Sequence, residues 1–207
     1  MKDETRVRLK KTALKFPSFY RAAHRIIKKS KGIKLNEEGV SGEELKFLLE
    51  KMGENKIIIE IGVFGGQTTR RFAKNNFVIG IDPFKGDSET GTLLGEYPED
   101  VYARFIKNTL GRRIMFFPLS SKDAFEFWDK NIKVKMIDSI FVDGWHTYEG
   151  MKIDFEWRKY LKKGGIIAFH DTNLPEVDLF IKENIFPNKS YKYLGEQDST
   201  KAFKKIA

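Results

Sequence analysis

Short, continuously apolar runs alternate with amphipathic stretches along most of the chain. The β-branched runs at 56–61 and 77–81 are typical of strands buried on both faces of a parallel sheet, and further runs predict strands at 114–117, 137–142 and 165–169. Helical periodicity predicts the segments between them, at 67–75, 99–110, 122–130 and 147–162. This alternation of strands and helices indicates a doubly wound α/β sheet.

The C-terminal part of the chain departs from this alternation. A helix predicted at 176–184 is followed by short strands at 191–195 and 200–206, which we expect to form an antiparallel hairpin. The whole pattern over residues 54–207 therefore predicts a Rossmann-like domain with a seven-stranded, mostly parallel sheet that ends in a hairpin.

Residues 1–53 are predicted to form a helical extension before this domain, with helices at 5–30 and 42–52. Residues 1–35 contain 12 basic and two acidic side chains, a net charge of +10, so the remaining residues carry a net charge of −1 within the total of +9. A nucleic-acid groove through the main domain is therefore not supported. Two explanations of the basic segment stay open: attachment to an anionic membrane surface, or a solvated helix packed on the sheet or in a dimer.

The composition excludes several classes of protein. The chain has no cysteine, which excludes disulfide scaffolds, thiolate zinc sites, iron–sulfur clusters and cysteine nucleophiles. No apolar run approaches the roughly 18 residues of a membrane span, and the N-terminal residues lack the apolar segment of a secretory signal. We expect a cytoplasmic protein, either free or peripherally attached to a membrane.

A glycine-rich turn follows the first predicted strand, and Asp82 ends the second. Together they favour a cofactor of the adenosine type, with Asp82 accepting hydrogen bonds from the ribose. The spacing lacks the middle glycine of a dinucleotide site, and Glu60 would repel a pyrophosphate but suits an ammonium or a sulfonium. The residues predicted to hold the cofactor here are Glu60, Gly62, Val63, Phe64, Gly65, Gly66, Thr68, Asp82 and Pro83.

A second group of polar residues follows the fourth and fifth predicted strands. Asp143 and His146 come after one strand, and His170 and Asp171 come after the other. Because the carboxyl ends of neighbouring parallel strands meet at one edge of a sheet, we expect these four side chains to form a functional cluster beside the cofactor.

The motifs resemble those of a known enzyme family. Glu60-x-Gly62-x-x-x-Gly66 resembles the first motif of class I S-adenosylmethionine-dependent methyltransferases. The segments Asp143–Gly150, with Asp154 and Trp157 beyond it, and His170–Asn173 resemble the macrocin and mycinamicin sugar O-methyltransferases and the cephalosporin methoxylation component. The resemblance implies that Ser120 and Ser121 lie near the adenine.

The same resemblance implies roles for the second group. Asp143 and Asp171 would bind a divalent metal, and His146 would be the general base. His170 stands where the sugar enzymes carry an acid, so either His170 is not a ligand or the metal is softer than magnesium, such as manganese. The predicted metal ligands are therefore Asp143, His170 and Asp171, and the predicted catalytic residues are His146 and Asp143.

The resulting hypothesis is an O-methyltransferase that uses S-adenosylmethionine, assisted by a metal, on a hydroxyl of a sugar or other small polyol. Its acceptor would be a small molecule or a glycan. Three alternatives remain: an RNA-directed methyltransferase that uses the basic N-terminal helix, a nicotinamide-dependent oxidoreductase, and a non-catalytic cofactor-binding module. Whether the chain forms a homo-oligomer is left open by the sequence.

Overall fold

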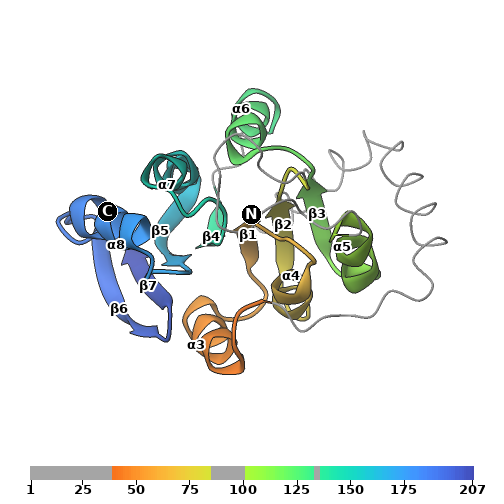
Figure 1. The fold of residues 1–207 in the computed structure, drawn as a ribbon, viewed down its shortest axis with the longest axis horizontal. Coiled ribbons are helices and arrows are strands. Elements are labelled where there is room, and N and C mark those ends of the chain that lie inside the picture. The colour runs from red at the N-terminus through yellow and green to blue at the C-terminus, as the bar shows by residue number, and fades with distance from the viewer. Residues whose placement is uncertain (1–38, 85–100, 133–135) are drawn as a thin grey trace.

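A computed structural model describes residues 39–84, 101–132 and 136–207, which form one mixed sheet flanked by helices (Figure 1). The sheet order is β3-β2-β1-β4-β5-β7-β6. β1 to β5 pair in parallel, and β7 pairs antiparallel with both β5 and β6. The strands are β1 (Ile57–Ile61), β2 (Phe77–Ile81), β3 (Ile114–Phe117), β4 (Ile137–Val142), β5 (Leu161–Phe169), β6 (Tyr191–Gln197) and β7 (Thr200–Lys205). The predicted Rossmann-like sheet with a closing hairpin is confirmed.

The described helices follow the predicted order. They are α3 (Gly42–Met52), α4 (Gln67–Phe72), α5 (Val101–Thr109), α6 (Ser121–Asn131), α7 (Tyr148–Phe155), the 3₁₀ helix η1 (Glu156–Lys159) and α8 (Pro175–Asn184). The helix predicted at 5–30 and the basic segment 1–35 lie outside the described residues. None of the helices in the described ranges has the length and apolar composition needed to cross a membrane.

The helix predicted at 67–75 ends at Phe72, and the largest boundary error lies between α7 and β5. The helix predicted at 147–162 ends earlier, and β5 begins at Leu161 instead of Gly165. Leu161 pairs with Ile137 before the register shifts, and Gly164 adopts a φ of +79° at this irregularity. The strand therefore contains a bulge at Gly164, a residue that the sequence pattern places just before the strand.

The two faces of the sheet have separate apolar cores. One core includes Trp128 of α6, Trp157 of η1 and Phe180 of α8, each at most 1% exposed. The opposite core includes Leu48 of α3 and Phe72 of α4. Figure 1 shows α6 and α7 on one side of the sheet and α3 and α4 on the other. Because both faces are covered, the ligand-accessible edge is the one at the carboxyl ends of the parallel strands.

Helix α3 packs directly on the sheet. Ser41 caps the helix in a capping box with Glu44, and Leu48 is fully buried against the sheet. The Glu44 carboxylate also accepts hydrogen bonds from Ser199 and Thr200 at the β6–β7 turn. The predicted domain boundary after residue 53 therefore falls between α3 and the sheet, although α3 shares an apolar core and hydrogen bonds with the sheet.

Candidate active site

The turn from β1 to α4 is shaped by residues with positive φ. Gly62, Phe64 and Gly66 have φ values of +82°, +43° and +79°. A Cβ built on Gly62 would lie 1.9 Å from the backbone oxygen of Asp143, so a glycine is required there. We call Gly62–Gly66 the donor turn. It touches the carboxyl end of β4, at the point where the strand order reverses.

Asp82, at the end of β2, holds the donor turn through backbone amides. Its Oδ2 accepts hydrogen bonds from the amides of Val63 at 3.1 Å and Phe64 at 2.9 Å, and its Oδ1 accepts from the amide of Phe84 at 2.7 Å. The side chain is buried, whereas the neighbouring Pro83 is partly exposed. The predicted ribose acceptor therefore has a structural role in the turn, and its contact with a ribose stays a prediction.

Glu60 is buried beneath the donor turn instead of lying open at the strand end. It is 1% exposed, and its Oε2 atom has no hydrogen-bond partner among the described residues. Burial raises the pKa of Glu60 well above its usual range; the neighbouring Thr69 side chain opposes this rise, and Asp143 and Asp82 add to it. An unpaired buried carboxyl oxygen is the kind of group that a bound cation would stabilise.

Three hydroxyls predicted to line the cofactor site make hydrogen bonds within the protein. Thr68 Oγ1 accepts a long hydrogen bond, 3.4 Å, from the amide of Val40. Ser120 is the N-cap of α6 and accepts from the amide of Asp123 at 3.1 Å. Ser121 Oγ accepts from the Trp157 indole at 3.1 Å. Each hydroxyl thus has a structural partner, and its contact with a cofactor stays a prediction.

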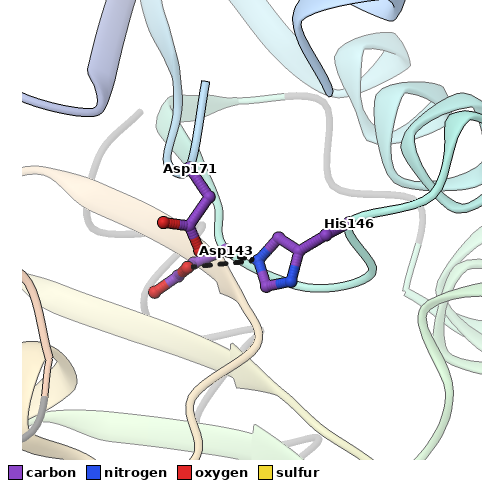
Figure 2. A group of neighbouring side chains, drawn as sticks. All are labelled: Asp143, His146 and Asp171. Atoms are coloured by element: carbon purple, nitrogen blue, oxygen red, sulfur yellow. Dashed lines mark ion pairs between the residues drawn. The ribbon is translucent and has the colours of Figure 1, made fainter. Parts of the chain in front are cut away.

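The predicted catalytic residues come together at the ends of β4 and β5 (Figure 2). His146 Nε2 lies 3.0 Å from Asp171 Oδ2 and 3.9 Å from Asp143 Oδ1. Burial alone lowers the pKa of His146, but Asp143 and Asp171 outweigh it and raise the pKa to about 9. The contacts with His146 and then His170 lower the pKa of Asp171. Asp171 also has a φ of +51°, a strained conformation of the kind found at functional sites.

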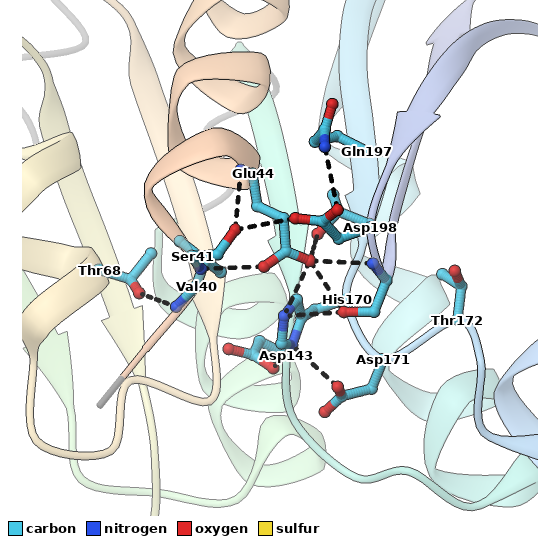
Figure 3. Close-up of polar contacts among 12 residues, drawn as sticks. Val40, Ser41, Glu44, Thr68, Asp143, His170, Asp171, Thr172, Gln197 and Asp198 are labelled. Atoms are coloured by element: carbon cyan, nitrogen blue, oxygen red, sulfur yellow. Dashed lines mark hydrogen bonds and ion pairs between the residues drawn. The ribbon is translucent and has the colours of Figure 1, made fainter. Parts of the chain in front are cut away.

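His170 lies between Glu44 of α3 and Asp143, which follows β4 (Figure 3). Its Nδ1 is 2.9 Å from Asp143 Oδ1 and 3.4 Å from Asp171 Oδ1. Its Nε2 is 3.3 Å from Ser199 Oγ and 3.4 Å from Glu44 Oε1. Burial alone lowers the pKa of His170, but Asp143 and Asp171 raise it to about 11. We call Asp143, His146, His170 and Asp171 the histidine cluster.

Comparison with known proteins identifies the family. The model of the family described as "Methyltransferase domain" matches residues 59–172, more than half of the chain, and this range contains the donor turn, Asp82 and the whole histidine cluster. The chain belongs to this family. The prediction of a class I S-adenosylmethionine-dependent methyltransferase is confirmed, and neither an oxidoreductase nor a non-catalytic module is favoured.

Solved structures of other methyltransferases share this fold. The O-methyltransferase from Bacillus cereus in complex with SAH is 18% identical, covers 88% of this chain and 90% of its own, and has a TM-score of 0.61. TomG from Streptomyces achromogenes, solved with SAM, is 15% identical with 90% of both chains covered and a TM-score of 0.59. The calicheamicin methyltransferase CalS11 is 16% identical over 91% of this chain and 93% of its own, with a TM-score of 0.58.

One curated relative also matches this methyltransferase. Protein y4gI of Sinorhizobium fredii, which is uncharacterized, is 32% identical over 97 residues. These residues are 46% of this chain and 10% of that protein, so the match spans about a tenth of the relative's length.

The sequence predicts a divalent metal, magnesium or manganese, held by Asp143, His170 and Asp171, and the geometry of the histidine cluster does not fit this ligand set. Both nitrogens of His170 face protein oxygens, so His170 is not placed as a ligand. One donor atom from each of Asp143, His146 and Asp171 lies within 4.8 Å of the others, but two carboxylates and an imidazole are not the oxygen-rich set that magnesium prefers. His170 also already contacts both carboxylates.

Two residues beside His146, Asp154 and Trp145, were not predicted as site residues. Asp154 of α7 is 3% exposed; burial raises its pKa to about 7, although hydrogen bonds from Ser121 and the Trp145 amide and the charge of His146 oppose the rise. Trp145 is 40% exposed. Two signals in the sequence could have indicated them. Asp154 is an acid among the apolar positions of a predicted helix, and Trp145 is next to the predicted base.

Proposed function

We propose that this methyltransferase transfers the methyl group of S-adenosylmethionine to a hydroxyl of a sugar or other small polyol. The observation that carries the proposal is the contact between the donor turn and the histidine cluster, through Gly62 and Asp143. The donor turn, Glu60 and Asp82 would hold S-adenosylmethionine, which supplies an electrophilic methyl group when bound. An imidazole base would then stand beside the acceptor.

His146 would take the proton from the acceptor hydroxyl. A hydroxyl is a weak nucleophile, and a positioned base contributes typically 10²–10⁴-fold to such a transfer. Asp171, 3.0 Å from Nε2, would orient the imidazole and stabilise the imidazolium that forms. Asp143, next to both the donor turn and His170, would hold the acceptor relative to the donor.

The acceptor class is supported by Trp145 and by one structural neighbour. Trp145 is exposed and immediately precedes His146, so its ring offers a flat apolar surface suited to the face of a sugar ring. CalS11 is described as a TDP-rhamnose 3'-O-methyltransferase. If Trp145 binds the acceptor, Trp145→Ala should raise KM for the acceptor while the affinity for S-adenosylmethionine, measured by calorimetry, stays unchanged.

The test of the function is a screen for S-adenosylhomocysteine release. The full-length protein is incubated with S-adenosylmethionine and a panel of sugars, nucleotide sugars and small polyols, beside His146→Ala as the matched control. Release with at least one hydroxyl acceptor, lost in the control, is expected. Release only with an RNA acceptor would contradict the proposal in favour of the RNA-directed alternative.

The basic N-terminal segment suggests where the enzyme acts. We propose that residues 1–35, with a net charge of +10, attach the enzyme to an anionic membrane surface. Co-sedimentation with vesicles tests this: recovery should be greater with anionic than with neutral lipid and should fall with added salt. Equal recovery with both lipids would favour a solvated or packed helix.

A further inference from the structure

The hydrogen bonds around His170 determine its charge. Asp143 Oδ1 lies 2.9 Å from Nδ1, and an ionised carboxylate only accepts hydrogen bonds, so Nδ1 must donate. Ser199 Oγ lies 3.3 Å from Nε2 but donates its single proton to Glu44 Oε1 at 2.8 Å. Toward His170 it therefore accepts. Both ring nitrogens donate, which only the imidazolium form can do.

The Glu44 carboxylate lies near Nε2 of His170, at the edge of the ring opposite Asp143. It is 4% exposed and accepts from the amides of Ser41 and Ser199 and from the hydroxyls of Ser199 and Thr200, at 2.8–3.1 Å. All four partners are donors, so they stabilise the ionised form of Glu44. Its Oε1 lies 3.4 Å from His170 Nε2. A buried anion contributed by α3 thus stands behind His170 (Figure 3).

His170 also contacts the two carboxylates that face the acceptor side. Its Nδ1 lies 2.9 Å from Asp143 and 3.4 Å from Asp171. We propose that the His170 side chain, held by Glu44, takes the place of a divalent cation between Asp143 and Asp171, so that these two carboxylates share a positively charged partner without a metal. A cation bound to the same oxygens would be repelled by the adjacent imidazolium.

This role makes His170 a positioning residue. It fixes Asp143 and Asp171, while His146 remains free to act as the base. The inference rests on the proposed function only for the location of the site. Metal binding can be measured without any acceptor, so a failed activity screen and a failed metal prediction are distinct outcomes.

The test is a titration of Mn²⁺ into the chelator-treated full-length protein, with free Mn²⁺ followed by electron paramagnetic resonance. The wild type and Asp143→Asn should bind Mn²⁺ equally weakly. His170→Asp replaces the imidazolium with a third carboxylate and should bind Mn²⁺ at least about tenfold more tightly than the wild type. Lys46→Asp makes the same change of charge on the exposed face of α3 and should match the wild type.

Two results would overturn the proposal. One is wild-type protein that binds one Mn²⁺ per chain at least about tenfold more tightly than Asp143→Asn. The other is a folded His170→Asp variant, judged by circular dichroism, with no gain in Mn²⁺ affinity. If that variant does not fold, the comparison of the wild type with Asp143→Asn decides alone: equal weak binding supports the proposal.

Discussion

The donor turn and the histidine cluster touch each other but are held in different ways. The two acids beside the donor turn are buried, at 2% exposed for Asp82 and 1% for Glu60, and Asp82 accepts hydrogen bonds from backbone amides of the turn. In the histidine cluster the side chains are 15–31% exposed, and they contact one another as ion pairs. The first region therefore depends on backbone geometry, and the second depends on a balance of charges.

This difference predicts that the two regions fail in different ways. Loss of the Asp82 side chain should weaken donor binding and stability together, because the same carboxylate holds the donor turn. Loss of a side chain from the histidine cluster should change turnover and pH dependence while the donor still binds. The following experiments test that separation, from the largest expected effect to the smallest.

His146→Ala should give the largest loss. Turnover should fall by roughly 10²–10⁴-fold, because the general base is removed. The affinity for S-adenosylmethionine, measured by calorimetry, should stay at the wild-type value. Glu149→Gln, an exposed acid three residues away, is the control and should retain turnover. Wild-type turnover in His146→Ala would show that another group accepts the proton.

Asp82→Ala should weaken donor binding by about 2–4 kcal/mol, because charge-assisted hydrogen bonds are lost both to the ligand and to the amides of the donor turn. The midpoint of urea unfolding should fall as well. Glu126→Ala, an exposed acid on α6, should change neither quantity. An unchanged affinity in calorimetry would remove Asp82 from the donor site.

Asp154→Asn tests a residue that lies behind the histidine cluster but is as buried as the donor turn. The pKa of Asp154 is about 7, raised from 3.8, so between these pH values the folded state keeps a proton that the unfolded state loses. The stability contributed by Asp154 therefore falls as pH rises through this window. We compare the free energy of unfolding of Asp154→Asn with that of the wild type at each pH. The difference between them should shift in favour of the variant by about 1–3 kcal/mol from pH 4 to pH 8.

Urea unfolding at the two pH values measures this difference. Glu126→Gln, at an exposed acid in the middle of α6, is the control for a general effect of removing one negative charge. A difference between Asp154→Asn and the wild type that does not change with pH would show that Asp154 is ionised in both states.

The pH profile should show the smallest change. His146 must be neutral to act as a base, and its pKa is about 9, so kcat/KM should rise about tenfold per pH unit between pH 7 and 9. Asp171→Asn removes a carboxylate that raises this pKa and should move the acid limb down by about one unit or more. The position of the limb is the measurement. If the acid limb of Asp171→Asn lies at the wild-type pH, Asp171 does not raise the pKa of His146.

The strands and the donor turn were predictable from the sequence because their signals are local. The apolar runs at 56–61 and 77–81 match β1 and β2 closely, since strands buried on both faces need continuous apolar residues. The glycine turn was predictable because only glycine tolerates the backbone contact at Gly62. The convergence of Asp143, His146 and Asp171 followed from strand order alone.

The partners of His170 were not predictable, because they come from distant elements. Glu44 has the local signal of a capping box, three residues after Ser41, and nothing in that signal indicates a contact 126 positions away. Ser199 lies on the turn of the hairpin, whose tilt over α3 depends on the packing of the sheet. The burial of Asp154 depends in the same way on the fit of α7 against the loop at Gly144.

The contact at Gly62 has a consequence for how acceptor specificity can change. Methyl transfer tolerates about 0.5 Å of misplacement between donor and acceptor. Because the backbone of the donor turn rests directly on Asp143, thermal displacements of the two are correlated, and their relative displacement is smaller than the motion of either. If the acceptor binds at Trp145, as proposed, a new acceptor could be accommodated there without altering the alignment of the reacting atoms. Divergence of substrate within this architecture should be concentrated in that outer loop.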